Sequence, residues 1–279
     1  MLECVVNVSE GRRGDVIDEL AAACGPALLD VHTDADHHRT VFTVARDAEA
    51  AARALTSVTA DRVDLSVHAG VHPRLGAIDV VPFVALAGSE PGDAVEAARS
   101  YATWVADALD LPAFLYGDAD PDGRSLPDVR RDAFVRRDPD TGPGAPHPRL
   151  GAVAVGARPP LVAVNCWLDR DDLGLAREIA GQVRERDGGL PGVRALGIAL
   201  ASRGRVQVSM NVTRLEACGV ERACTAVRRF AYEGGADVER VELVGLLQAA
   251  ELDRCSPEFR NWSGIGPDAT IEARLRAHS

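Results

Sequence analysis

Six apolar segments in the second half of the chain alternate between strand length and helix length, and their order restricts the fold more than any other feature. Strand candidates are short runs rich in Val, Ile and Leu, whereas helix candidates repeat their apolar residues every three or four positions. The segments are a strand at 161–166, a helix at 173–183, strands at 194–201 and 206–212, a helix at 220–232 and a strand at 241–246. The order β-α-β-β-α-β predicts a ferredoxin-like subdomain, with helices packed on an antiparallel sheet.

The first half of the chain contains the same elements with one extra strand and one extra helix. Strands are predicted at 3–8, 27–31, 40–45, 78–86 and 112–116, and helices at 15–24, 48–59 and 94–109. We therefore assign the chain to the α/β (α+β) class, with two ferredoxin-like βαββαβ subdomains at residues 1–160 and 161–279. The boundary is expected near the Arg-Pro-Pro run at 158–160.

Residues 117–148 break this pattern. Asp, Pro, Gly and Arg dominate the segment, and its apolar residues follow neither the helix period nor the strand period. A stretch of this length inside a compact protein is usually either a functional loop or a disordered, solvated excursion. The sequence favours neither interpretation.

Composition restricts the partners. The formal net charge is −11, so the chain does not attract nucleic acid or acidic membranes non-specifically, and an anionic substrate must be held by a few placed arginines. No apolar run is long enough for a membrane-spanning helix, and the N-terminus lacks the pattern of a signal peptide. The six cysteines form no Cys-x-x-Cys pair. We expect a cytoplasmic protein that binds small molecules and neither nucleic acid nor membranes.

The hexapeptide HPRLGA occurs twice, at 72–77 and at 147–152. Both copies lie in the first half of the chain, so they are not equivalent positions of two duplicated domains. We interpret them as two unrelated uses of the same six letters. If both loops face one cleft, His147 is a candidate second histidine near the substrate.

Motifs for several kinds of chemistry are missing. The sequence has no Gly-x-Ser-x-Gly nucleophile elbow and no glycine-rich phosphate loop. His68 and His72 have the spacing of two zinc ligands on a helix, but Gly70 and Pro73 disfavour a helix there, and no metal is predicted. Histidine acid–base chemistry remains. His72 either exchanges protons while Arg74 holds a carboxylate, or it caps its loop through its ring nitrogens.

Four longer segments together carry a family resemblance. They are LECVVNVSEGRR from residue 2, LLDVHTDADHHRTVFT from residue 28, DLSVHAGVHPRLGAIDVVPFV from residue 64 and TGPGAPHPRLGAVAVGARP from residue 141. With LPAFLYGDA, VRALGIAL and VQVSMNVT, they resemble segments of the glutamate formimidoyltransferases (formiminotransferases) in the same order and at similar spacing. The resemblance covers about residues 2–252, and it is to the monofunctional form without a cyclodeaminase domain.

The resemblance implies transfer of the formimino group of N-formimino-L-glutamate to tetrahydrofolate, which gives 5-formiminotetrahydrofolate and L-glutamate in histidine catabolism. Tetrahydrofolate would be the co-substrate, without a metal, and the enzyme would be a homodimer. His72 would be the general acid/base that serves both reacting nitrogens. The substrate-binding residues would be Arg39, Arg74, Asp34 and His32. The folate-binding loop would comprise Gly142, Pro143, Gly144, Ala145, Pro146, His147, Pro148, Arg149, Leu150 and Gly151.

The chain departs from the family pattern at three positions. Ala69 and Val71 stand where many relatives carry Lys and Glu, and His32 stands where an acidic residue is often found. These changes keep open a paralogue that transfers a formimino or formyl group to or from a different amine in a specialised pathway. A non-catalytic folate-binding relative is disfavoured, because the segments at 7–11 and 72–74 are intact.

Overall fold

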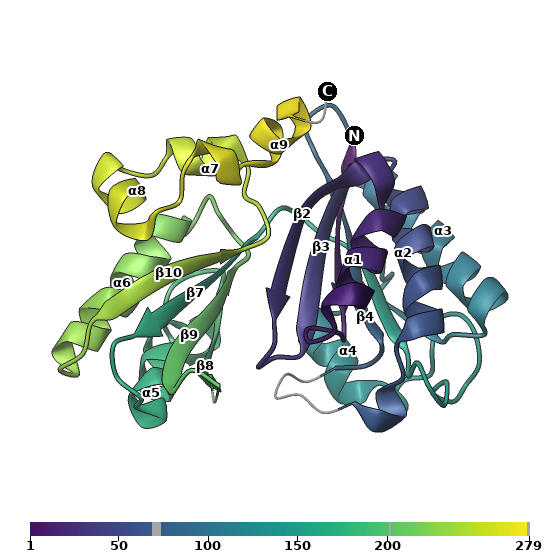
Figure 1. The fold of residues 1–279 in the computed structure, drawn as a ribbon, viewed down its shortest axis with the longest axis horizontal. Helices are drawn as coiled ribbons and strands as arrows, with labels where there is room; N and C mark the ends of the chain where they lie inside the picture. Colours follow the sequence, from purple (N-terminus) through teal and green to yellow (C-terminus); the bar gives the residue numbers. More distant parts are fainter. Residues whose placement is uncertain (69–73, 201, 278–279) are drawn as a thin grey trace. The chain divides into compact units, whose positions relative to one another are not determined.

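The computed structural model describes residues 1–68, 74–200 and 202–277. The chain divides into two compact units, Met1–Pro159 and Pro160–Ser279, each built on its own sheet (Figure 1). The predicted general acid/base His72 and the departures at Ala69 and Val71 lie outside the described residues. Within the described ranges, no helix combines the length and the apolar character needed to cross a bilayer.

The first 85 residues form a complete ferredoxin-like motif. Its elements are β1 (Leu2–Val8), α1 (Gly14–Ala23), β2 (Leu28–Asp34), β3 (Arg39–Arg46), α2 (Ala48–Arg62) and β4 (Ile78–Ala85). β1 pairs antiparallel with β3 and β4, and β2 pairs antiparallel with β3, which gives the order β2-β3-β1-β4. The predicted β-α-β-β-α-β topology is confirmed for this part of the chain.

The first unit extends this motif by two strands and two helices, rather than by the one strand and one helix predicted. The added elements are α3 (Pro91–Leu109), β5 (Ala113–Gly117), α4 (Leu126–Asp132) and β6 (Val153–Ala157). β6 pairs in parallel with β4 and with β5, so the six-stranded sheet is mixed and not purely antiparallel. The five residues VAVGA of β6 give a weak strand signal because alanine and glycine are poor strand formers. Gly156 is needed there, since a Cβ would overlap the ring of Tyr116 on β5.

Helices α1, α2 and α3 cover one face of this sheet (Figure 1). Strand side chains alternate in direction, so Val6, Phe42 and Val81 point into the helix-covered core. Val80 points to the opposite face, where a smaller apolar cluster contains Phe114 and residues of α4. On this second face, α4 packs over β4, β6 and β5.

The segment at 117–148 is a folded part of the first unit. Phe134, just after α4, packs edge-on against Phe114 of β5, with ring centroids 4.9 Å apart. The buried carboxylate of Asp120 forms ion pairs with Arg124 and Arg137. The ion pairs lie within the segment and the aromatic contact fastens it to β5, so both stabilise it without the apolar periodicity of a helix or strand.

The second unit has the predicted ferredoxin-like topology. Its elements are β7 (Val162–Leu168), α5 (Leu173–Val183), β8 (Val193–Leu200), β9 (Arg205–Val212), α6 (Val220–Glu233) and β10 (Val238–Val244). All three strand pairs are antiparallel and give the order β10-β7-β9-β8. Gly197 of β8 lets α5 approach closely, because a Cβ there would overlap the backbone of Ala176 and Arg177.

Three short helices follow the second sheet: α7 (Ala249–Asp253), α8 (Pro257–Ser263) and α9 (Ile271–Ala277). Leu252, Phe259 and Ile265 from this tail join the core between the sheet and its helices. The described chain also contains the single-turn 3₁₀ helices η1 (Gly25–Ala27), η2 (Leu65–Val67), η3 (Glu185–Asp187) and η4 (Pro267–Ala269). The tail is thus an integral part of the second unit.

Candidate active site

Three of the predicted substrate-binding residues lie on the face of the first sheet opposite α1, α2 and α3. In the register of β2 and β3, Asp34 is opposite Arg39 and His32 is opposite Val41. Phe42 of β3 points to the helices, and side chains of a strand alternate between its two faces, so Arg39 and Val41 point to the other face. Asp34 and His32 are opposite these two residues and therefore lie on that same face. Arg39 donates a hydrogen bond from Nη2 to Oδ1 of Asn7 on the adjacent strand β1.

Arg39 is one of three arginines around a buried carboxylate. Asp79 accepts a hydrogen bond from the backbone N–H of Leu75 at 2.7 Å, and it forms an ion pair with Arg130 of α4. Burial lowers the pKa of Arg39 to about 10, Asp79 opposes this shift, and the charges of Arg130 and Arg74 add to it. Arg39 remains a cation at neutral pH, so this face concentrates positive charge on a chain whose net charge is −11.

Asp34 is held by its own turn. Its Oδ1 accepts the backbone N–H of His37 at 2.8 Å, and its Oδ2 lies 2.8 Å from Nδ1 of His37. Burial alone raises the pKa of Asp34, but the two contacts with His37 prevail and lower it to about 2. The carboxylate is therefore ionised at neutral pH and fixes the link between β2 and β3.

Glu10 lies two residues after the end of β1, and its carboxylate is surrounded by hydrogen-bond donors. Its Oε1 accepts the backbone N–H groups of Gly11, Arg12 and Arg13 at 2.9–3.0 Å, and Nε of Arg13 donates to Oε2 at 2.6 Å. Three successive N–H groups aimed at one oxygen form a backbone nest for an anion. Burial raises the pKa of Glu10, yet these hydrogen bonds prevail and hold it below its usual value.

Two histidines that were not predicted as site residues stack beside this nest. His38 has a left-handed backbone with φ of 51°, and its Nδ1 accepts the N–H of Gly11 at 3.0 Å. The rings of His38 and His68 stack with centroids 3.9 Å apart. Nη1 of Arg74 lies 2.6 Å from Nδ1 and 2.8 Å from Nε2 of His68. Burial, Arg74 and His38 together lower the pKa of His68 to about 4, so it is neutral at pH 7.

The two copies of HPRLGA pair with each other. Gly76 and Gly151 form an antiparallel bridge, in which the N–H of Ala77 donates to Leu150 at 2.9 Å and the N–H of Ala152 donates to Leu75 at 3.0 Å. A Cβ on Gly76 would overlap the carbonyl of Ala152, and a Cβ on Gly151 would overlap that of Leu75. The interpretation as two unrelated uses is therefore wrong, because the LGA part of each copy is the other's partner.

In the rest of the second HPRLGA copy, the side chain of His147 forms hydrogen bonds with the backbone of its own loop. Nδ1 of His147 accepts the N–H groups of Arg149 and Leu150 at 3.2 and 3.0 Å. Nε of Arg149 lies 3.4 Å from Oδ2 of Asp64, and the carbonyl of Arg149 accepts from Leu65 at 2.8 Å. The predicted folate loop is thereby fastened to the segment that leads out of α2.

The rest of the predicted folate loop is more open. Gly144, Ala145 and Pro146 are exposed, and Pro143 is half-buried. Gly142 has a positive φ of 85°, and a Cβ there would lie 3.1 Å from the carbonyl oxygen of Leu111. The proximity of His147 to His72 stays a prediction, because His72 lies outside the described residues.

Both units of the chain match models of one protein family. The N-terminal subdomain of the formiminotransferase domain matches residues 1–158, and the formiminotransferase domain matches residues 165–258. The chain belongs to the formiminotransferase family. The two matched regions correspond to the two units of the fold.

Curated relatives agree with this family. The chain is 37% identical over 270 residues to the glutamate formimidoyltransferase of Streptococcus pyogenes serotype M1, covering 90% of each chain. It is 32% identical over 295 residues to the glutamate formimidoyltransferase of Thermoplasma acidophilum, covering 99% of this chain and 97% of the relative. It is 33% identical to the formimidoyltransferase-cyclodeaminase of Sus scrofa, covering 90% of this chain but 51% of that protein.

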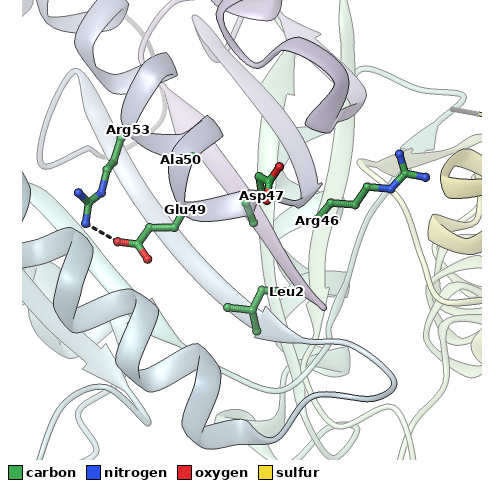
Figure 2. A pocket seen from close by; sticks show the side chains of 7 residues that line it. Leu2, Arg46, Asp47, Glu49, Ala50 and Arg53 are labelled. Carbon is green, nitrogen blue, oxygen red and sulfur yellow. Dashed lines mark hydrogen bonds and ion pairs between the residues drawn. The ribbon is translucent and has the colours of Figure 1, made fainter. Parts of the chain in front are cut away.

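A cavity of about 440 Å³ in this formiminotransferase lies away from the predicted residues. It is lined by Leu2, Arg46, Asp47, Ala48, Glu49, Ala50 and Arg53, at the opposite end of β3 from Arg39 (Figure 2). Figure 2 shows Arg53 directed at Glu49, with which it forms an ion pair, while Arg46 extends away from them. The guanidinium of Arg53 also lies over the Trp104 ring, 5.2 Å from its centroid.

Two charged site residues that the sequence did not single out, Asp79 and Glu10, share one weak signal. Asp79 interrupts the apolar run AIDVVPFV, and Glu10 lies two residues after the apolar strand at 2–8. A charged residue in or beside a buried run must find a partner, so both positions could be singled out without naming that partner. Among the residues that the structure describes, no group of three or more His, Cys, Asp and Glu side chains is placed to hold a metal ion.

Proposed function

We propose that this protein transfers the formimino group of N-formimino-L-glutamate to tetrahydrofolate, giving 5-formiminotetrahydrofolate and L-glutamate. The observation that carries the proposal is the match to the glutamate formimidoyltransferase of Streptococcus pyogenes over 90% of both chains. The family match across both units supports the same reaction. These relatives favour the glutamate-directed reaction over transfer to or from a different amine.

The chemistry requires one proton to leave and another to arrive. N5 of tetrahydrofolate attacks the amidine carbon and forms the new C–N bond, after which N5 loses its proton. The bond between that carbon and the glutamate nitrogen then breaks, and this nitrogen gains a proton. His72 is the proposed group for both transfers, because an imidazole accepts and returns a proton near neutral pH.

Positive charge at the site supports an anionic substrate. Formiminoglutamate carries two carboxylates, and arginine binds a carboxylate through two parallel N–H donors. Arg39 and Arg74 are the proposed carboxylate ligands, and the charge of Arg74 lowers the pKa of both Arg39 and His68. His32 and Asp34 lie beside Arg39 and are the proposed polar contacts for the amidine nitrogens.

The loop from Gly142 to Gly151 is the proposed contact for the folate. Its exposed residues at 144–146 offer backbone groups to a pterin ring, and a glycine lets a ligand approach the backbone closely. The half-exposed guanidinium of Arg149 is the proposed partner for the anionic glutamate tail. The proposal also includes a homodimer, which light scattering on the purified protein tests.

The function is tested by mixing the purified protein with tetrahydrofolate and N-formimino-L-glutamate. Product is detected after acidification by the absorbance of the 5,10-methenyl derivative. We expect product with the wild type, and loss of turnover with retained folate affinity for His72→Ala. Absence of product from folded wild type with active folate contradicts the reaction. Product only from another N-formimino amino acid supports the paralogue instead.

A further inference from the structure

His38, His68 and Arg74 form a compact cluster to which the proposed reaction gives only Arg74 a role. They come from the turn between β2 and β3, the residue after η2 and a position shortly before β4. The two imidazoles are nearly parallel, with an interplanar angle of 28°, and Nη1 of Arg74 lies within hydrogen-bond distance of His68. Three separate loops of the first unit therefore meet at one stack.

The backbone N–H of Gly11, which belongs to the nest around Glu10, fixes the orientation of the His38 ring. The N–H of Gly11 faces Nδ1 of His38, so this nitrogen must accept a hydrogen bond and the ring is neutral with its proton on Nε2. Glu10, with Oε1 3.6 Å from Nδ1, favours protonation of His38, whereas burial and the charges of Arg12 and Arg13 oppose it. Gly11 cannot withdraw easily, because it is packed tightly against the backbone of residues 34 and 39.

His68 is held neutral by the guanidinium beside it. Nη1 of Arg74 lies within 2.8 Å of both ring nitrogens of His68, and because arginine only donates hydrogen bonds, this contact suits a neutral ring, which has an acceptor nitrogen. Of the charged and titratable groups that face His68, Arg74 and His38 oppose protonation and Glu10 favours it. Nη2 of Arg74 donates to the carbonyl of His37 at 3.2 Å. The ring of His68 and the carbonyl of His37, which belong to different loops, thus hold Nη1 and Nη2 of Arg74.

A long arginine side chain held at both terminal nitrogens keeps one orientation, and a planar guanidinium depends on orientation to bind a carboxylate through two bonds. We propose that His68, supported by its stack on His38, is a positioning residue that orients Arg74 for a carboxylate of the formimino donor. This inference rests on the proposed function, in which Arg74 binds that substrate. His68 then acts on substrate affinity and leaves proton transfer unchanged.

The test is a double-mutant cycle between His68 and Arg74. His68→Phe keeps a ring to stack on His38 but has no acceptor nitrogen, and Arg74→Lys keeps the charge but not the planar fork. We expect each single variant to raise KM for N-formimino-L-glutamate about tenfold, the effect of one lost hydrogen bond to a charged group. The double variant should raise KM no further than Arg74→Lys alone, because both changes remove the same contact. KM for tetrahydrofolate should stay unchanged.

A merely structural role predicts a different pattern. If the stack only supports the fold, His68→Phe lowers the melting temperature and changes kcat and both KM values together, or its effect adds to that of Arg74→Lys. Either pattern overturns the proposal. Arg254→Lys is the matched control, because Arg254 is an arginine paired with Glu216 and Glu251 in the tail of the second unit. It should leave both KM values unchanged.

Nuclear magnetic resonance separates this proposal from the reaction itself. With ¹⁵N-labelled histidine at pH 7, the imidazole signals of His68 should report a neutral ring, and Arg74→Lys should shift them while leaving those of His147 in place. This result supports the contact even if the wild type makes no product, in which case only the reaction fails. Unshifted His68 signals in Arg74→Lys overturn the positioning role whether or not the protein is active.

Discussion

Gly76 and Gly151 face each other across an antiparallel bridge, so the two copies of HPRLGA bind one another through their own LGA residues. Each glycine occupies a position where a Cβ would overlap the backbone of the other copy. The repeat therefore joins the loop before β4 to the loop before β6. It links the segment that contains the proposed acid/base His72 with the proposed folate loop.

The first prediction concerns Gly151, which combines a positive φ of 73° with this close approach. Gly151→Ala should lower the free energy of unfolding by about 3 kcal/mol, because left-handed strain and backbone overlap add. Gly88→Ala is the control, since Gly88 has a φ of 86° but open space around it, and it should cost about 1 kcal/mol. Urea unfolding measures both values, and equal losses would show that the bridge adds nothing.

The second prediction concerns the buried carboxylate of Asp79. Asp79→Asn leaves Arg130 without its counter-ion and should destabilise the protein by about 3 kcal/mol. The exposed pair of Asp128 and Arg131 supplies the comparison, and Asp128→Asn should cost less than about 1 kcal/mol. Thermal or urea unfolding of the two variants decides, and a similar small loss for both contradicts the role of Asp79.

The third prediction is the pH dependence that His68 contributes. Its pKa falls from the ordinary 6.5 to about 4 in the folded protein. As pH decreases from 6.5 to about 4, the unfolded chain binds a proton that the folded chain does not, so stability decreases over this window. The full shift corresponds to about 3 kcal/mol, but solvent screening of the partly exposed ring reduces the expected effect to about 1 kcal/mol.

Unfolding of the wild type and His68→Phe at pH 7 and at pH 4.5 measures this effect. The variant should lose about 1 kcal/mol less on acidification than the wild type. Identical losses would mean that His68 keeps its ordinary pKa in the folded protein.

The fourth prediction concerns Glu10, whose pKa is lowered by backbone donors and Arg13. A lowered carboxyl pKa stabilises the fold above pH 4.5 and ceases to do so as pH falls below it. Glu10→Gln should therefore cost about 2 kcal/mol at pH 7, and the difference from the wild type should shrink below pH 4.5. The exposed Glu258→Gln is the control and should change stability little at either pH. A gap that is independent of pH would assign the loss to shape rather than charge.

The sequence predicts the fold well where elements follow one another in order. In the second unit, each strand pairs with a neighbour that the β-α-β-β-α-β order already implies, and the structure confirms this topology. The same holds for the first 85 residues. Asp34 and Arg39 could likewise be placed together, because a short link between β2 and β3 brings them opposite each other.

Contacts between distant loops leave no comparable signal. His38, His68 and Arg74 belong to three segments without periodicity, and the spacing of His68 and His72 points only to a metal site that is then disfavoured. The bridge between Gly76 and Gly151 also depends on β6, whose parallel pairing has no local pattern. Long-range parallel pairs are set by the completed sheet rather than by the residues of one strand.

The position of β6 between β4 and β5 sets an order of assembly. β5 leaves the ribosome before β6, yet it joins the sheet only through β6, so it must wait for the later strand. Until then the edge of β4 exposes unpaired N–H and C=O groups to other nascent chains. Because the second HPRLGA copy immediately precedes β6, a chain truncated before residue 147 would lack both β6 and the partner of the first copy. The six-stranded sheet can therefore be completed only after synthesis has passed β6.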